Sequence, residues 1–166
     1  MGRFVLMGVS GCGKTSVGEA LAARGLTRFI DGDTLHPPGN IAKMASGQPL
    51  DDDDRAPWLA DVGAALGAGA PPVTIGCSSL KRRYRDWIRA AVGGSTVHFL
   101  HLAAPKAVLE RRVNTREGHF MPPALLDSQF ATLQPLQPDE AGQVIDIDRP
   151  VEAVIDDAAA YIARNS

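Results

Sequence analysis

The sequence predicts an α/β fold: a five-stranded parallel sheet flanked by helices in three layers, within one domain spanning residues 1–166. Three observations predict it. Five short, mostly apolar segments alternate with segments of helical periodicity, the pattern of a parallel sheet covered on both faces. A glycine-rich loop separates the first apolar segment from the first helical one. The chain has 166 residues and 45% hydrophobic content, which suits one globular domain.

The expected elements follow one another in alternation. Strands are predicted at Arg3–Met7, Arg28–Asp31, Val73–Cys77, Val97–Leu102 and Val144–Ile147. Helices are predicted at Lys14–Arg24, Asn40–Ala45, Ala56–Leu66, Leu80–Val92, Pro105–Val113, Pro122–Leu133 and Val151–Ala163. Gly25 suits a C-terminal cap of the first helix, and Pro150 suits the start of the last. Ligands of such sheets bind beyond the carboxyl ends of the strands, so the residues that follow each strand are the candidates for chemistry.

Composition and charge narrow the class of protein. The net charge of −2 and the pI near 6.0 predict no general attraction to nucleic acid or to an anionic membrane. The sequence contains no apolar run of about 18 residues and no basic-then-apolar leader, so a cytoplasmic enzyme is expected. Cys12 and Cys77 form no metal-binding spacing and are too few for a disulfide framework.

The loop after the first strand, Gly8-Val9-Ser10-Gly11-Cys12-Gly13-Lys14-Thr15, fits the phosphate-loop (P-loop) pattern and stands between a strand and a helix, as that pattern requires. Its glycines let successive backbone N–H groups turn inward at a helix N-terminus and form a cradle for phosphate. Lys14 can reach the β- and γ-phosphates of a nucleotide, and Thr15 offers a hydroxyl to Mg²⁺. The alternative, a glycine-rich turn with a surface lysine, is disfavoured because such a turn would not require the Lys-Thr pair.

The second strand ends in Asp31-Gly32-Asp33, two carboxylates that should face the P-loop. One can orient Mg²⁺ while the other accepts a proton from an attacking hydroxyl. An Asp-Gly turn with a helix-capping aspartate is the alternative, and the upstream P-loop favours the catalytic interpretation. His36 suits either substrate binding or a structural hydrogen bond.

Basic residues follow the third strand and open the third helix. Arg55, after four aspartates that suit a helix N-terminus, can hold a substrate carboxylate in a two-pronged contact or lie on the surface. The basic cluster Lys81, Arg82, Arg83 and Arg85 can suggest an RNA surface. Because Lys81 and Arg85 share a helix face at spacing i, i+4, a two-residue anion contact plus solvated charge is a sufficient interpretation. The third strand ends in cysteine and serine, with no aspartate for magnesium, so that role moves to Asp31 or Asp33.

A glycine and paired prolines at Gly118–Pro123 break two helices and suit a closing flap, with a lid segment at about 112–135. Arginines in such a flap can cover the transferring phosphate and exclude water. A helical hairpin with a solvated basic face is the alternative. Asp148-Arg149-Pro150, after the fifth strand, is a place where an adenine can rest.

Several motifs together carry a family resemblance over nearly the whole chain. They are Gly8-Val9-Ser10-Gly11-x-Gly13-Lys14, Asp31-Gly32-Asp33-x-Leu35-His36-Pro37, Asn40-Ile41-x-Lys43-Met44-x-Ser46-Gly47, Asp52-Asp53-Asp54-Arg55-x-Pro57-Trp58-Leu59, Cys77-Ser78-x-Leu80-Lys81-x-x-Tyr84-Arg85-Asp86 and Arg112-x-x-x-Arg116-x-Gly118-His119-Phe120. The chain resembles the gluconokinase family of small P-loop kinases. His-Pro after the paired aspartates and the later Gly-His-Phe are more specific than the P-loop alone.

The resemblance implies an activity and a fold. The activity is ATP-dependent phosphorylation of D-gluconate on its 6-hydroxyl, which gives 6-phospho-D-gluconate. The fold is the P-loop kinase fold shared with shikimate and nucleoside monophosphate kinases, with a mobile helical lid and often a homodimer. ATP and Mg²⁺ are the expected cofactors, D-gluconate is the expected substrate, and no nucleic acid or membrane partner is expected.

The resemblance also implies roles for individual residues. Residues expected at ATP are Gly8, Ser10, Gly11, Cys12, Gly13, Lys14, Thr15, Ser16, Arg112, Arg149 and Pro150. Residues expected at D-gluconate are Asp33, His36, Arg55, Lys81, Arg85, His119 and Gln134. Lys14, Asp33 as base and Arg116 as lid arginine are expected to be catalytic, with Thr15 and Asp31 serving Mg²⁺.

The sequence departs from the usual family pattern at Cys12, Ser79 and Glu117, and the last changes the charge of the lid.

The sequence bears differently on three other functions. A kinase of another small acceptor, such as shikimate or a nucleoside monophosphate, shares the architecture and stays open. A GTPase switch is disfavoured because the sequence has no Asn-Lys-x-Asp motif. A non-catalytic nucleotide-binding module is disfavoured because the catalytic groups are present.

Overall fold

Five strands form one parallel sheet in the order β2-β3-β1-β4-β5. The computed structural model describes residues 2–115 and 123–166. The strands are β1 (Arg3–Met7), β2 (Arg28–Asp31), β3 (Val73–Gly76), β4 (Val97–Ala103) and β5 (Gly142–Asp146). The predicted five-stranded parallel α/β fold is therefore confirmed.

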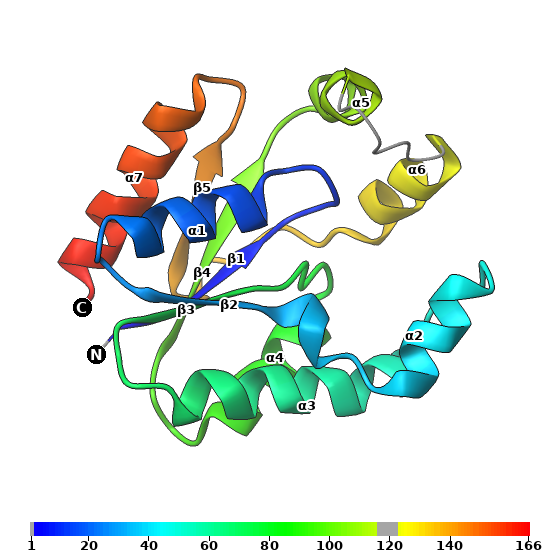
Figure 1. Ribbon diagram of the computed structural model, residues 1–166, viewed down its shortest axis with the longest axis horizontal. Helices are drawn as coiled ribbons and strands as arrows, with labels where there is room; N and C mark the ends of the chain where they lie inside the picture. Colours follow the sequence, from blue (N-terminus) through cyan, green and yellow to red (C-terminus); the bar gives the residue numbers. More distant parts are fainter. Residues whose placement is uncertain (1, 116–122) are drawn as a thin grey trace.

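Helices cover both faces of the sheet (Figure 1). One face carries α1 (Lys14–Ala23) and α7 (Val151–Arg164), and the other carries α3 (Asp52–Ala68) and α4 (Arg82–Val92). The 3₁₀ turn η1 (Gly32–Leu35) follows β2 and leads to α2 (Pro38–Ala45). Helices α5 (Lys106–Thr115) and α6 (Pro123–Thr132) lie beyond the loop after β1, at the upper right of Figure 1.

The central strand β1 separates two hydrophobic clusters. Phe4 and Leu6 pack on the side of α1 and α7, whereas Val5 and Met7 pack on the side of α3 and α4. All four side chains are fully buried. This alternation is the period of a strand that is covered on both faces, and it fixes the end of β1 rigidly under the loop that follows.

Most element boundaries differ from the predicted ones by one or two residues, and the largest difference is at the start of α3. Helix α3 begins at Asp52 and not at Ala56, because Asp51 and Asp54 form a reciprocal capping box at its N-terminus. Strand β5 begins at Gly142, two residues before the predicted start. Gly142 has φ 154°, and a Cβ there would lie 2.0 Å from the Phe99 carbonyl oxygen, so only glycine fits this approach to β4.

Within residues 2–115 and 123–166, no helix is both long enough and apolar enough to cross a membrane.

Candidate active site

The loop between β1 and α1 has the backbone of a phosphate cradle. Gly8, Gly11 and Gly13 have φ values of 145°, 83° and 97°, which disfavour side chains. A Cβ at Gly8 would lie 2.8 Å from both Cys12 Sγ and the Leu102 carbonyl oxygen. The loop therefore needs glycine at this position, as the P-loop pattern predicts.

Lys14 lies across this loop. Its Nζ donates to the carbonyl oxygens of Gly8 at 3.0 Å and Val9 at 3.3 Å. Cys12 is buried in the core, so its side chain anchors the loop from beneath. Thr15 and Ser16 follow in the first turn of α1 and are exposed.

The acidic pair lies at the same edge of the sheet. Asp31 pairs in register with Gly76 of β3, and Gly76 pairs with Leu6 of β1, so the three residues form one row across the strands. Asp33 and Gly8 each lie two residues beyond this row, past the carboxyl ends of β2 and β1. Asp31 Oδ1 accepts the backbone N–H of Asp33 at 3.0 Å and caps η1.

Two glycines allow the turn after β2, the end of β3 and the start of α1 to approach closely. A Cβ at Gly32 would lie 2.3 Å from the Gly76 carbonyl oxygen, and one at Gly76 would lie 3.8 Å from Lys14 Cβ. Burial raises the pKa of the Cys77 thiol to about 11; among the smaller effects, Lys14 lowers that pKa and Asp33 raises it. Lys14 and Asp33 therefore both lie within electrostatic reach of the Cys77 thiol.

Trp58 of α3 holds the turn that carries Asp33. Its indole Nε1 donates to the Gly32 carbonyl oxygen at 2.9 Å. The His36 ring stacks on Trp58 with centroids 3.9 Å apart and planes 18° from parallel, and His36 Nδ1 lies 3.3 Å from Asn40 Nδ2. Burial lowers the pKa of His36, Asp33 opposes this shift and Arg55 adds to it. His36 thus has structural partners and also lies within electrostatic reach of Asp33 and Arg55.

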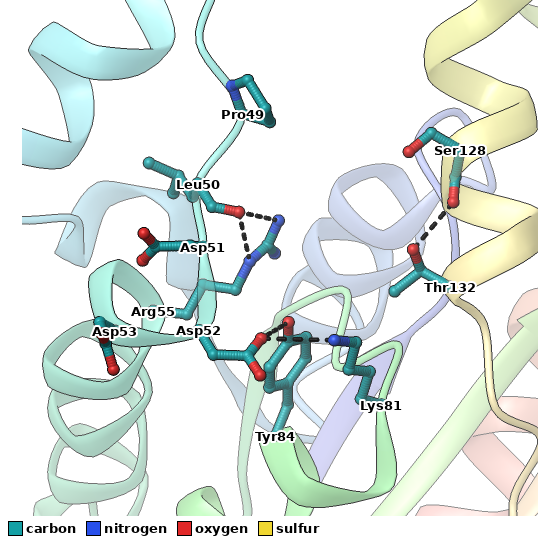
Figure 2. A pocket seen from close by; sticks show the side chains of 10 residues that line it. All are labelled: Pro49, Leu50, Asp51, Asp52, Asp53, Arg55, Lys81, Tyr84, Ser128 and Thr132. Carbon is teal, nitrogen blue, oxygen red and sulfur yellow. Dashed lines mark hydrogen bonds and ion pairs between the residues drawn. The ribbon is translucent and has the colours of Figure 1, made fainter.

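A cavity of about 520 Å³ opens between the start of α3, the start of α4 and helix α6 (Figure 2). Arg55 and Lys81, two predicted substrate residues, line it. The full lining is Pro49, Leu50, Asp51, Asp52, Asp53, Arg55, Lys81, Tyr84, Ser128 and Thr132.

The two cations of this cavity are arranged around one ring. Arg55 Cζ and Lys81 Nζ each lie 5.4 Å from the centroid of Tyr84. The Tyr84 hydroxyl donates to Asp52 Oδ1 at 2.5 Å, and Lys81 Nζ donates to the same oxygen at 3.4 Å. Burial and this acceptor raise the pKa of Tyr84 to about 12, and the bond from Tyr84 lowers the pKa of Asp52.

Arg85, by contrast, does not line this cavity. Its side chain is fully buried and pairs with Glu140 through Nε at 2.7 Å and Nη2 at 2.9 Å. Its other N–H groups donate to the carbonyl oxygens of Ser79, Leu80 and Pro135. All five guanidinium donors are thus used within the protein, so Arg85 is corrected from substrate binding to holding the loop before Lys81.

Gln134 also has an internal partner. Its side-chain Oε1 accepts the backbone N–H of Arg82 at 2.8 Å, and the backbone N–H of Gln134 donates to the Leu80 carbonyl oxygen at 2.7 Å. The segment after α6 is thereby fastened to the start of α4. Gln134 is not among the residues that line the cavity.

The predicted adenine residues meet near the end of β5. Arg112 of α5 donates through Nη2 to the Ile147 carbonyl oxygen. Arg149 donates to the Asp146 carbonyl oxygen at 2.8 Å and pairs with Asp157 at 2.7 Å, next to Pro150 at the start of α7. Arg116 and His119 lie outside the described residues.

Sequence reasoning missed Gln129 as a site residue. Its Oε1 accepts the backbone N–H of Ser10 at 2.7 Å, and its Nε2 donates to Ser10 Oγ at 2.8 Å. A signal was present: Gln129 is a polar residue among Leu126, Phe130 and Leu133, on the apolar face of its helix. Asp52 and Glu140 gave no comparable signal, because their partners are far along the chain.

Comparisons with known proteins show what the chain is similar to. A family model described as "AAA domain" matches residues 4–136. The chain is 45% identical to the thermoresistant gluconokinase of Escherichia coli (strain K12), over 92% of this chain and 88% of that protein. It is 48% identical to the thermosensitive gluconokinase of the same organism, over 91% of this chain and 82% of that protein.

Solved structures give the same picture. The crystal structure of a gluconokinase from Sinorhizobium meliloti 1021 superposes with a TM-score of 0.88 at 45% identity, over 98% of this chain and 92% of that chain. Shikimate kinase from Aquifex aeolicus superposes with a TM-score of 0.62 at 14% identity, over 98% of this chain and 97% of that one, which shows a shared fold.

Proposed function

The chain belongs to the gluconokinase family, and from this premise we propose that it transfers the γ-phosphoryl group of ATP to the 6-hydroxyl of D-gluconate. The product is 6-phospho-D-gluconate. The observation that carries the proposal is that Lys14, Asp33 and the cavity with Arg55 and Lys81 share the carboxyl edge of one sheet.

The P-loop fits a nucleoside triphosphate. Three glycines with positive φ open the loop at the N-terminus of α1, where backbone N–H groups and the helix dipole favour phosphate. Lys14 lies on this loop, bonded only to neutral carbonyl and thiol groups, so it can turn to a phosphate oxygen without breaking an ion pair within the described residues. Arg112, Arg149 and Pro150 are proposed to border the adenine.

Thr15 and Asp31 are proposed to serve Mg²⁺. Hydroxyl and carboxylate oxygens are the donors this ion prefers, and it is commonly held by one or two protein oxygens together with substrate phosphates. Among the described residues no group of three or more His, Cys, Asp or Glu could hold a metal ion, which suits an ion held largely by the nucleotide. When bound, Mg²⁺ neutralises charge on the phosphates.

The cavity suits a polyhydroxylated monocarboxylate. Arg55 and Lys81 offer positive charge for the carboxylate, and the acidic side chains Asp51, Asp52 and Asp53 can accept hydrogen bonds from hydroxyl groups. Ser128 and Thr132 add hydroxyls from the opposite wall. A cavity of about 520 Å³ is in the range of small-molecule sites.

Asp33 is proposed as the general base. It is exposed on η1, while Asp31 caps the turn and Trp58 holds Gly32 between them. Proton removal from the 6-hydroxyl activates the oxygen that attacks the γ-phosphorus. The lid role of about 112–135, with Arg116 at the transferring phosphate and His119 at the substrate, stays a prediction, as do a homodimer and a cytoplasmic location.

An acceptor panel tests the proposed function. Purified protein is assayed for ADP release in the presence of Mg²⁺ and ATP with D-gluconate, other aldonates, shikimate and nucleoside monophosphates. D-gluconate should give the highest kcat/KM, and NMR of the product should place phosphate on the 6-oxygen. A higher kcat/KM with shikimate or a nucleoside monophosphate would instead support the alternative acceptor.

A further inference from the structure

Helix α6 contacts both halves of the candidate site. On one side, Gln129 makes two hydrogen bonds to Ser10 of the P-loop, at 2.7 Å to its N–H and 2.8 Å to its hydroxyl. On another, Ser128 and Thr132 face the acceptor cavity (Figure 2). Residues 128 and 129 are adjacent on the helix, so any shift of its cavity side also shifts the group that holds the P-loop.

The helix is also fastened to the loop by apolar contacts. Leu126 is 2% exposed and belongs to the core cluster that contains Val9 and Cys12 of the P-loop. Phe130 and Leu133 pack against the same cluster. These apolar contacts pack the helix on the loop without any part of the Gln129 side chain.

The two hydrogen bonds of Gln129 therefore serve a purpose other than packing the helix on the loop. A glutamine on the apolar face of a helix costs desolvation unless its amide is bonded. Here both the acceptor and a donor of the amide are matched to one P-loop residue. Ser10 N–H belongs to the backbone that is proposed to surround the phosphates, so Gln129 orients part of the phosphate cradle.

We infer that Gln129 is a positioning residue that couples the acceptor cavity to the P-loop, so that a sugar acid against Ser128 and Thr132 strengthens nucleotide binding. The inference rests on the proposed function. Coupling of this kind is reciprocal: the nucleotide must strengthen acceptor binding by the same factor. A merely structural glutamine would change stability and leave this factor unaltered.

Calorimetry tests the inference. The dissociation constant of the non-hydrolysable imido analogue of ATP, with Mg²⁺, is measured with and without saturating D-gluconate. In the wild type, gluconate should tighten analogue binding about fivefold or more. In Gln129→Leu, which keeps the apolar packing, the ratio should fall to about one. Ser10→Ala, which removes one of the two bonds, should lower the ratio less.

Gln143→Leu is the matched control, because Gln143 lies on β5 and bonds Arg164; it should keep the wild-type ratio. A wild-type ratio in Gln129→Leu, or no coupling in a wild-type enzyme that does phosphorylate gluconate, would overturn the inference alone. Failure of the proposed function looks different, since the wild type would then form no phosphogluconate, and the inference would fall with it.

Discussion

Arg55 and Arg85 carry the same charge, and both were predicted to hold the acceptor. Arg55 lines the cavity and donates to one backbone carbonyl, that of Leu50, at 3.3 to 3.4 Å. Arg85 lies fully buried against Glu140. An arginine at either position predicts the same contact with a carboxylate. The difference is the acidic partner of Arg85, Glu140, which lies 55 positions away along the chain and so gives no local signal.

Arg55→Ala is predicted to weaken gluconate binding. Loss of a hydrogen bond between charged groups costs about 1.5–3 kcal/mol, which corresponds to roughly a 10- to 150-fold rise in KM for gluconate. The KM for ATP should change little. Steady-state kinetics measure both, with Arg24→Ala as control, because Arg24 pairs with Glu152 and Asp156 on α7. An unchanged KM for gluconate would remove Arg55 from the carboxylate site.

Arg85→Met is predicted to lower stability. Removing one partner of a buried ion pair costs about 3–5 kcal/mol, because the other charge is left buried. Urea unfolding measures the loss. Arg83→Met is the control, because the Arg83 side chain is 62% exposed. If Arg85→Met kept wild-type stability and raised the KM for gluconate, the original substrate role of Arg85 would be restored.

Trp58→Phe tests the support of the proposed base. The variant keeps an aromatic ring against His36 and loses the bond to the Gly32 carbonyl oxygen. A hydrogen bond is worth about 0.5–1.5 kcal/mol, so kcat should fall roughly 2- to 10-fold as Asp33 loses its orientation. Trp87→Phe on α4 is the matched control. Equal kcat in the two variants would contradict a positioning role for Trp58.

At the scale of elements, local signals predicted most of the structure. The P-loop and its flanking strand and helix follow from residues close in sequence. The start of α3 was predicted four residues too late, because aspartates suit the solvated residues before a helix as well as its first turn. The turn η1 was predicted only as an alternative, an Asp-Gly turn with a capping aspartate, and Asp31 does cap it.

The segment after α6 gives a prediction on pH. Burial raises the pKa of Glu140, but bonds from Arg85 and Arg89 outweigh it and lower this pKa from 4.5 to about 2. A lowered native pKa stabilises the fold above pH 4.5, and the contribution is lost as pH falls towards 2. The loss should total about 3 kcal/mol.

Unfolding free energy of wild type and of Glu140→Gln, measured by urea at several pH values, checks this contribution. The difference between the two proteins should shrink as the pH falls below about 4.5. Asp139→Asn, at an exposed neighbour whose carboxylate pairs with Arg82, is the control and should show a smaller change. A difference that stays constant with pH would contradict the ion-pair account of Glu140.

At the scale of the whole molecule, the strand order brings together residues from motifs that lie far apart in the sequence. The strand order puts β3 between β2 and β1, so Asp31, Gly76 and Leu6 align in one row and the residues beyond them meet. Sequence reasoning predicted that the ends of parallel strands share an edge. Arg55 and Lys81 were predicted from the family resemblance, but the opposite wall with Ser128 and Thr132 was not, because α6 reaches the cavity only through the tertiary fold.

The most direct test of the account is the turnover of Asp33→Asn. The steady-state kcat of the variant, with D-gluconate, ATP and Mg²⁺, is compared with that of the wild type. The dissociation constants of D-gluconate and of ATP are measured for both proteins. Removal of a general base should lower kcat about 10²–10⁴-fold while both dissociation constants stay within about threefold. Near-normal turnover in a folded Asp33→Asn protein would contradict the claim that this carboxylate deprotonates the acceptor beside the P-loop.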